Sequence, residues 1–114
     1  MFSDCTSLTA APNLPATILA PACYCGMFYG CTNIQIAPVL PATTLAESCY
    51  DNMFSDCSSL NYVQCHATNI QAYGCLFNWL SGVKTNGTFV KAASVDWPSG
   101  SSGIPVDWTI VDAE

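Results

Sequence analysis

The chain has 114 residues, which is enough for one domain. It carries 2 Lys+Arg against 8 Asp+Glu, for a formal net charge of −6. This acidity argues against partners that present runs of phosphate, so we expect no nucleic acid and no anionic membrane surface. Apolar residues make up 51% of the chain, which excludes a disordered protein. No apolar stretch approaches the ~18 residues that cross a bilayer, so we expect no direct membrane insertion.

The dominant feature of the sequence is a period of 26 residues, which predicts stacked repeats. Met1-Phe2 recurs as Met27-Phe28 and Met53-Phe54. Two columns of cysteines keep the same spacing, namely Cys5, Cys31 and Cys57, and Cys23, Cys49 and Cys75. We therefore predict three repeats at 1–26, 27–52 and 53–78. Residues 79–114 are predicted to form a degenerate fourth repeat and a C-terminal cap.

Within each repeat, the sequence predicts one extended segment and one segment of helical turns. Residues 8–14 and their copies are the extended part, although Pro12 and Pro38 cannot donate to a ladder and predict a short or irregular strand. Residues 60–66 contain no proline and predict the best strand. Leu19, Cys23 and Met27 follow an i, i+4, i+8 spacing, which indicates one apolar stripe of a helix or of tight helical turns.

These elements predict an α/β repeat fold, with parallel strands on one face and short helical or 3₁₀ turns on the other, closed by a β-rich C-terminal cap. The predicted core consists of columns of equivalent side chains. They are Phe2/Phe28/Phe54, Leu8/Ile34/Leu60, Leu14/Leu40, Leu19/Leu45 and the two cysteine columns.

The C-terminal segment has its own pattern. Asn86-Gly87 between β-prone residues predicts a hairpin over 83–90. Residues 98–103 read as a loop, and residues 108–111 alternate as a final strand. Trp97 and Trp108 are large enough to cover the open end of the core.

The repeat core resembles a known family. An F-x-x-C-x-x-L pattern spans Phe2–Leu8, Phe28–Ile34 and Phe54–Leu60, and A-P-x-L-P-A-T follows in the first two repeats. These motifs resemble the BspA-like leucine-rich repeats of Bacteroides-type bacterial surface proteins. The resemblance implies a short leucine-rich-repeat solenoid in a cell-surface or secreted bacterial protein, which binds protein or glycan ligands in adhesion and has no catalytic activity.

Met1 occupies the same repeat position as Met27 and Met53, so it need not be an initiator. We therefore expect the chain to be the C-terminal part of a longer exported array, with a signal sequence and further repeats upstream.

The eight cysteines allow three interpretations. The first is a ladder of buried free thiols, which is favoured because Val83 continues the Cys5 column and valine can replace a packed thiol. The second is a disulfide within each repeat, through the Cys-x17-Cys pairs 5/23, 31/49 and 57/75. The third is a metal site at Cys23-x-Cys25 or Cys65-His66, although neither has zinc-ribbon spacing.

We expect no enzyme activity, cofactor or metal, because His66 is the only histidine and no nucleophile or phosphate-loop motif is present. The function expected is a non-catalytic module that binds a protein or glycan through its strand face. The candidate binding residues on that face are Thr9, Asn13, Gln35, Val39 and Asn61. The alternative is a passive structural spacer, or a segment that self-associates through the open N-terminal strand edge. The five tyrosines could form an aromatic face, but Tyr24 and Tyr50 are expected to pack between adjacent repeats.

Overall fold

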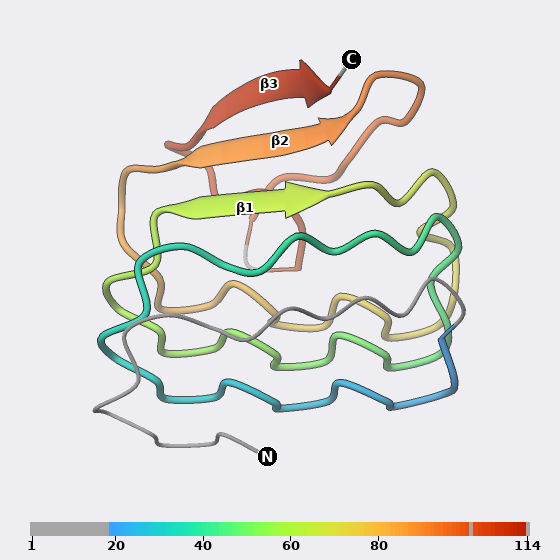
Figure 1. The fold of residues 1–114 in the computed structure, drawn as a ribbon, viewed down its shortest axis with the longest axis horizontal. Helices are drawn as coiled ribbons and strands as arrows, with labels where there is room; N and C mark the ends of the chain where they lie inside the picture. Colours follow the sequence, from blue (N-terminus) through green and yellow to red (C-terminus); the bar gives the residue numbers. More distant parts are fainter. Residues whose placement is uncertain (1–18, 101, 114) are drawn as a thin grey trace.

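The computed structural model describes residues 19–100 and 102–113 of the chain. Its strands are β1 (Tyr62–Cys65), β2 (Thr88–Ala92) and β3 (Thr109–Ala113). All pairings are parallel, and the strands form one open sheet in the order β1-β2-β3 (Figure 1). The inward-facing pair Val63 and Phe89 is fully buried and in register, so β1 and β2 fix one wall of the core.

Opposite the sheet lie three segments of consecutive turns, at 21–30, 47–56 and 73–82, which we call the turn ribbons. They are the zigzag traces in the lower half of Figure 1. Backbone N–H groups along a ribbon alternate between two acceptors. In the middle ribbon, Cys49 N–H donates to Ala46 O three residues back (3.1 Å), whereas Tyr50 N–H donates to Cys75 O in the next ribbon (3.0 Å). Each ribbon is thus a row of tight turns joined edge to edge with its neighbour.

Every fourth residue of a ribbon has a left-handed backbone. These positions are Ala22, Gly26 and Gly30, then Ser48, Asn52 and Asp56, then Gly74, Asn78 and Gly82. An α-helix has negative φ throughout and repeats every 3.6 residues. A four-residue repeat with positive φ is therefore incompatible with a helix, and it suits the Gly, Asn, Asp and Ser found at most of these positions.

The predicted α/β leucine-rich-repeat solenoid is wrong. The described residues contain no helix, and they form a small compact unit with a three-stranded open parallel sheet. Only β1 comes from the predicted repeats, since β2 and β3 both follow residue 78. The apolar spacing does not separate the two structures, because it follows the i, i+3, i+4, i+7, i+8 pattern of a helix at Ala46, Cys49, Tyr50, Met53 and Phe54. The physical reason is the left-handed backbone at every fourth ribbon residue, which a helix cannot contain. The repeat boundaries themselves stay a prediction.

The predicted best strand, 60–66, is present as β1. The equivalent earlier segment meets β1 only through isolated bridges, from Ile36 to Tyr62 and from Leu40 to Cys65. Pro38 lies between these bridges and has no N–H to donate, so a continuous ladder cannot form there. The expectation of a short or irregular strand in the proline-containing segment is therefore confirmed for residues 34–40.

The described members of the predicted core columns are mostly buried. Phe28, Phe54, Ile34, Leu60, Leu40, Leu45, Cys31, Cys57, Cys49 and Cys75 are all in the core, whereas Leu19 and Cys23 are half-buried at its margin. Phe2, Cys5, Leu8 and Leu14 lie outside the described residues. Equivalent positions stack because the ribbons are hydrogen-bonded in register. The Phe28 and Phe54 rings, for example, lie 5.5 Å apart and nearly parallel.

The tail closes the core with its tryptophans, as predicted. Trp97 stacks on Trp79 with ring centroids 5.7 Å apart. Trp108 is almost fully buried, and its indole N–H donates to Lys84 O (2.8 Å). The predicted final strand is present as β3.

The predicted hairpin over 83–90 is wrong. Thr88 N–H donates to Asn61 O (2.9 Å), and Thr109 N–H donates to Gly87 O (2.8 Å), so the chain here lies between two parallel neighbours. Glycine is required at 87 for close approach, because a Cβ there would lie 2.5 Å from Trp108 Cε2 and 2.7 Å from Asn61 O.

A Gly87→Ala substitution should therefore lower the free energy of unfolding by about 1–3 kcal/mol, since either the indole or the β1–β2 register must shift. Urea denaturation followed by tryptophan fluorescence measures this. Gly26→Ala is the control, because a Cβ there meets nothing within 4 Å and costs only the left-handed backbone, about 1 kcal/mol. Equal losses in the two variants would contradict the packing argument.

Candidate functional site

The structure brings together only part of the predicted strand-face site. Thr9 and Asn13 lie outside the described residues. Gln35 is exposed, Asn61 is half-buried, and the two are adjacent because Asn61 N–H donates to Gln35 O (2.9 Å). Val39 lies farther along the same segment and is 48% exposed. Gln35, Val39 and Asn61 are not among the lining residues of the hollows described below.

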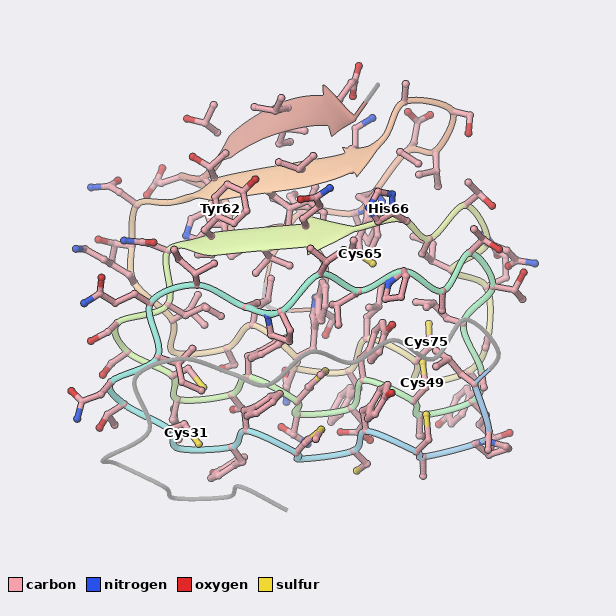
Figure 2. All side chains as sticks on the ribbon, in the orientation of Figure 1. Cys31, Cys49, Tyr62, Cys65, His66 and Cys75 are labelled. Carbon is pink, nitrogen blue, oxygen red and sulfur yellow. The ribbon has the colours of Figure 1, made fainter. Side chains whose placement is uncertain are left out.

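The cysteines support the free-thiol interpretation. None of the seven described cysteines is in a disulfide. Figure 2 shows Cys49 and Cys75 close together near one end of the ribbons, with Cys31 at the other end. A 31/49 disulfide, which the Cys-x17-Cys spacing suggested, would have to join opposite ends of the molecule and is not formed.

Burial holds these thiols in the protonated form. It raises the pKa of Cys49, Cys57 and Cys65 to about 12 in each case. The Cys57 thiol also donates to Phe28 O (3.0 Å), as a packed group with its own partner. Thiolate is the form that attacks electrophiles and binds metals, so these cysteines act as core side chains at neutral pH.

The two metal candidates do not assemble. Cys65 is buried, whereas His66 is half-buried and its Nε2 lies 3.1 Å from the Gln64 amide nitrogen. Cys23 is half-buried and Cys25 is exposed. Across the described part of the chain, no three His, Cys, Asp or Glu side chains are grouped in a way that could hold a metal ion.

Most aromatic rings belong to a continuous stack through the core. Tyr50 is buried between Tyr24 (6.2 Å between centroids) and Trp79 (5.7 Å), with the rings nearly parallel. This confirms that Tyr24 and Tyr50 pack between successive segments. Three other rings among the described residues are exposed: the Tyr73 side chain is 85% exposed, that of Phe77 54% and that of Tyr29 39%.

Tyr73 and Phe77 border a hollow of about 400 Å³ that is lined by Ser48, Asp51, Tyr73, Gly74 and Phe77. We call it the turn-face hollow. Its two walls are neighbouring ribbons, since Ser48 N–H donates to Tyr73 O (3.1 Å) and Asn52 N–H donates to Phe77 O (2.9 Å). Gly74 lines the hollow without a side chain, and a Cβ there would lie 3.3 Å from Ser48 Oγ.

A second hollow, of about 230 Å³, adjoins the first and shares Gly74 and Phe77 with it. Phe77 is thus a projecting ring with space on both sides. The sequence reasoning missed Phe77 and Asp51 as binding residues. The signal was available in the 26-residue columns, where the outward positions of Glu47 and Asp51 become Tyr73 and Phe77 in the next ribbon.

Comparison of the chain with known protein families, curated proteins and solved structures finds no match. The part of the chain that the structure describes holds no helix that could span a bilayer.

The first prediction from these thiols concerns labelling. At pH 8 a thiol reagent should modify the exposed Cys25 well before Cys49, Cys57 or Cys65, which need unfolding. Because burial and the nearby Asp51 carboxylate raise the pKa of Cys25, its labelling rate should climb with pH as thiolate forms. Peptide mass spectrometry after timed quenching identifies the sites. Native labelling of Cys65 as fast as that of Cys25 would contradict the buried-thiol arrangement.

The second prediction concerns the stability of the folded chain at alkaline pH. The folded-state pKa of Cys65 is about 12, well above the ordinary thiol value of about 8.5. The unfolded chain therefore loses this proton first as pH rises, and stability falls between about pH 9 and 12. Urea unfolding at pH 7, 9 and 10.5 should show a smaller fall in Cys65→Ala than in the parent, by up to about 1.4 kcal/mol per pH unit. Parallel curves would refute this linkage.

Proposed function

We propose that this chain is a non-catalytic recognition module of a cell-surface or secreted bacterial protein, and that it binds a protein or glycan. The observation that carries the proposal is the pair of projecting rings, Tyr73 and Phe77, on the rim of the turn-face hollow. The extracellular location is supported by the resemblance of the F-x-x-C-x-x-L core to bacterial surface repeats.

The physical support is the free energy that would be gained if a partner buried these two exposed rings. Burying a large apolar side chain contributes about 1.5–3 kcal/mol, and aromatic residues dominate the energetics of binding interfaces. The chain buries Tyr50, Phe54 and Trp79 in its aromatic stack, whereas the two rings beside the hollow are not enclosed. Two rings that stay outside, next to a hollow of ligand-binding size, are placed for contact with a partner.

The predicted strand face is a second proposed surface, with Gln35, Val39 and Asn61 as its described members. It lies across the molecule from the turn ribbons (Figure 1). Its contribution can therefore be separated from that of the turn-face hollow by substitution.

A second candidate function, self-association, is favoured by the outer edge of β3. β3 pairs with β2 along one edge and is the last strand of the described sheet, and its Ile110 side chain is 53% exposed. Unpaired strand edges with apolar side chains are templates for another strand. The N-terminal edge proposed from the sequence lies outside the described residues.

Binding to a peptide array and a glycan array tests the recognition function. The unsubstituted chain should bind some of the peptides or glycans on these arrays. Tyr73→Ala/Phe77→Ala should weaken binding at least ten-fold, because two contact rings of about 1 kcal/mol or more each are lost. Gln35→Ala/Asn61→Ala, assayed on the same arrays, measures the separate contribution of the proposed strand face. A passive spacer would bind neither array, and self-association would appear as a concentration-dependent mass that Ile110→Lys abolishes.

A further inference from the structure

We infer that the turn-face hollow receives a cationic side chain, arginine above lysine, from an exposed segment of a partner protein. This inference rests on the proposed recognition function and specifies its ligand. It comes from the arrangement of carboxylates and rings on two neighbouring ribbons.

Two acidic residues and two aromatic residues alternate across the ribbon boundary. Asp51 lines the hollow together with Tyr73 and Phe77. Glu47 is exposed and precedes Asp51 by one four-residue turn, as Tyr73 precedes Phe77. The ribbon hydrogen bonds hold this pattern in register, so each carboxylate position faces a ring position.

Neither positive side chain of the sequence lines the hollow. Both positive side chains of the sequence are lysines, Lys84 and Lys91. Lys91 forms an ion pair away from the hollow, with Nζ 2.8 Å from Asp112 Oδ1, and it also donates a hydrogen bond to Val95 O. Lys84 is not among the residues that line the hollow. With a net charge of −6, the molecule as a whole also attracts a cationic partner.

The Asp51 carboxylate has a hydrogen-bond partner on its own ribbon, and its negative charge acts on a neighbouring thiol. The Asn52 side-chain amide donates to Asp51 Oδ1, which fixes the carboxylate on its ribbon. Burial, and then the charge of this carboxylate, raise the pKa of Cys25 in the ribbon on the other side. The negative charge of Asp51 lies beside the two rings because all three side chains line the same hollow.

Guanidinium chemistry fits this combination better than an apolar side chain does. Aromatic faces attract cations by about 0.5–1 kcal/mol at exposed sites. A carboxylate can accept two parallel N–H bonds from a planar guanidinium, which also stacks on rings. A hollow of about 400 Å³ accommodates one long side chain. An apolar ligand would instead have to desolvate Asp51 without compensation.

The probe for the test is the peptide acetyl-Gly-Arg-Gly-amide, with acetyl-Gly-citrulline-Gly-amide as its uncharged isostere. Titrations are followed by the NMR signals of the Tyr73 and Phe77 rings. The arginine peptide should shift both rings and bind at least five-fold more tightly than the citrulline peptide. Raising NaCl from 50 to 500 mM should reduce this difference, because an exposed ion pair is screened by salt.

Two charge-matched variants isolate Asp51. Asp51→Asn should weaken binding of the arginine peptide about three- to five-fold and leave the citrulline peptide unaffected. Asp96→Asn, at an exposed carboxylate away from the hollow, changes net charge equally and should leave binding within two-fold of the parent. Phe77→Ala should weaken the arginine peptide about two- to five-fold. Unchanged chemical shifts away from the substitution show that each variant is folded.

Equal binding of the arginine and citrulline peptides, or equal loss in Asp51→Asn and Asp96→Asn, would overturn the inference. Methyl β-D-glucopyranoside shifting these rings while the arginine peptide does not would also overturn it, in favour of a glycan ligand. In either case array ligands that depend on Tyr73 and Phe77 would leave the recognition function standing. An absence of any ligand on arrays and in titrations would refute both.

Discussion

Hydrogen bonds between neighbouring turn ribbons are the constraint on which the rest of the structure depends. Alternate N–H groups leave each ribbon and reach the next one, as Phe28 N–H reaches Met53 O and Phe54 N–H reaches Trp79 O (2.9 Å each). This sets which side chains stack and therefore which are buried. The aromatic stack, the thiol columns and the turn-face hollow all follow from the same registration.

The registration also explains how a chain with so little regular secondary structure satisfies its backbone. Buried N–H and C=O groups must find partners, and strands account for few of them here. The i−3 bonds inside ribbons and the bonds between ribbons supply partners along 21–30, 47–56 and 73–82. Thiols suit the interior of this arrangement because they are small and apolar, and a raised pKa keeps them uncharged.

The sequence predicted the composition of the core well and the local geometry poorly. The 26-residue period identified buried columns such as Phe28/Phe54, because equivalent positions must share an environment. It could not distinguish four-residue turns from helical turns, since both place residues i and i+4 on one side. The positive-φ positions, occupied by Gly26, Asn52 and Asn78 among others, were the discriminating signal. The hairpin predicted from Asn86-Gly87 is wrong because Gly87 instead allows close packing against Trp108.

The candidate site was harder to predict, because its rings appear only as a departure from the 26-residue columns, in which Tyr73 and Phe77 replace acidic residues. The tail, in contrast, has a consequence for how the molecule can change in length. Asn78 N–H donates to Ser102 Oγ (3.0 Å), and the Trp79 indole donates to Gly103 O (2.8 Å). Ser102 and Gly103 thus lie against 73–82 on the side where another ribbon would pair. A further ribbon could pair at that end only if these residues moved away and capped the added ribbon instead.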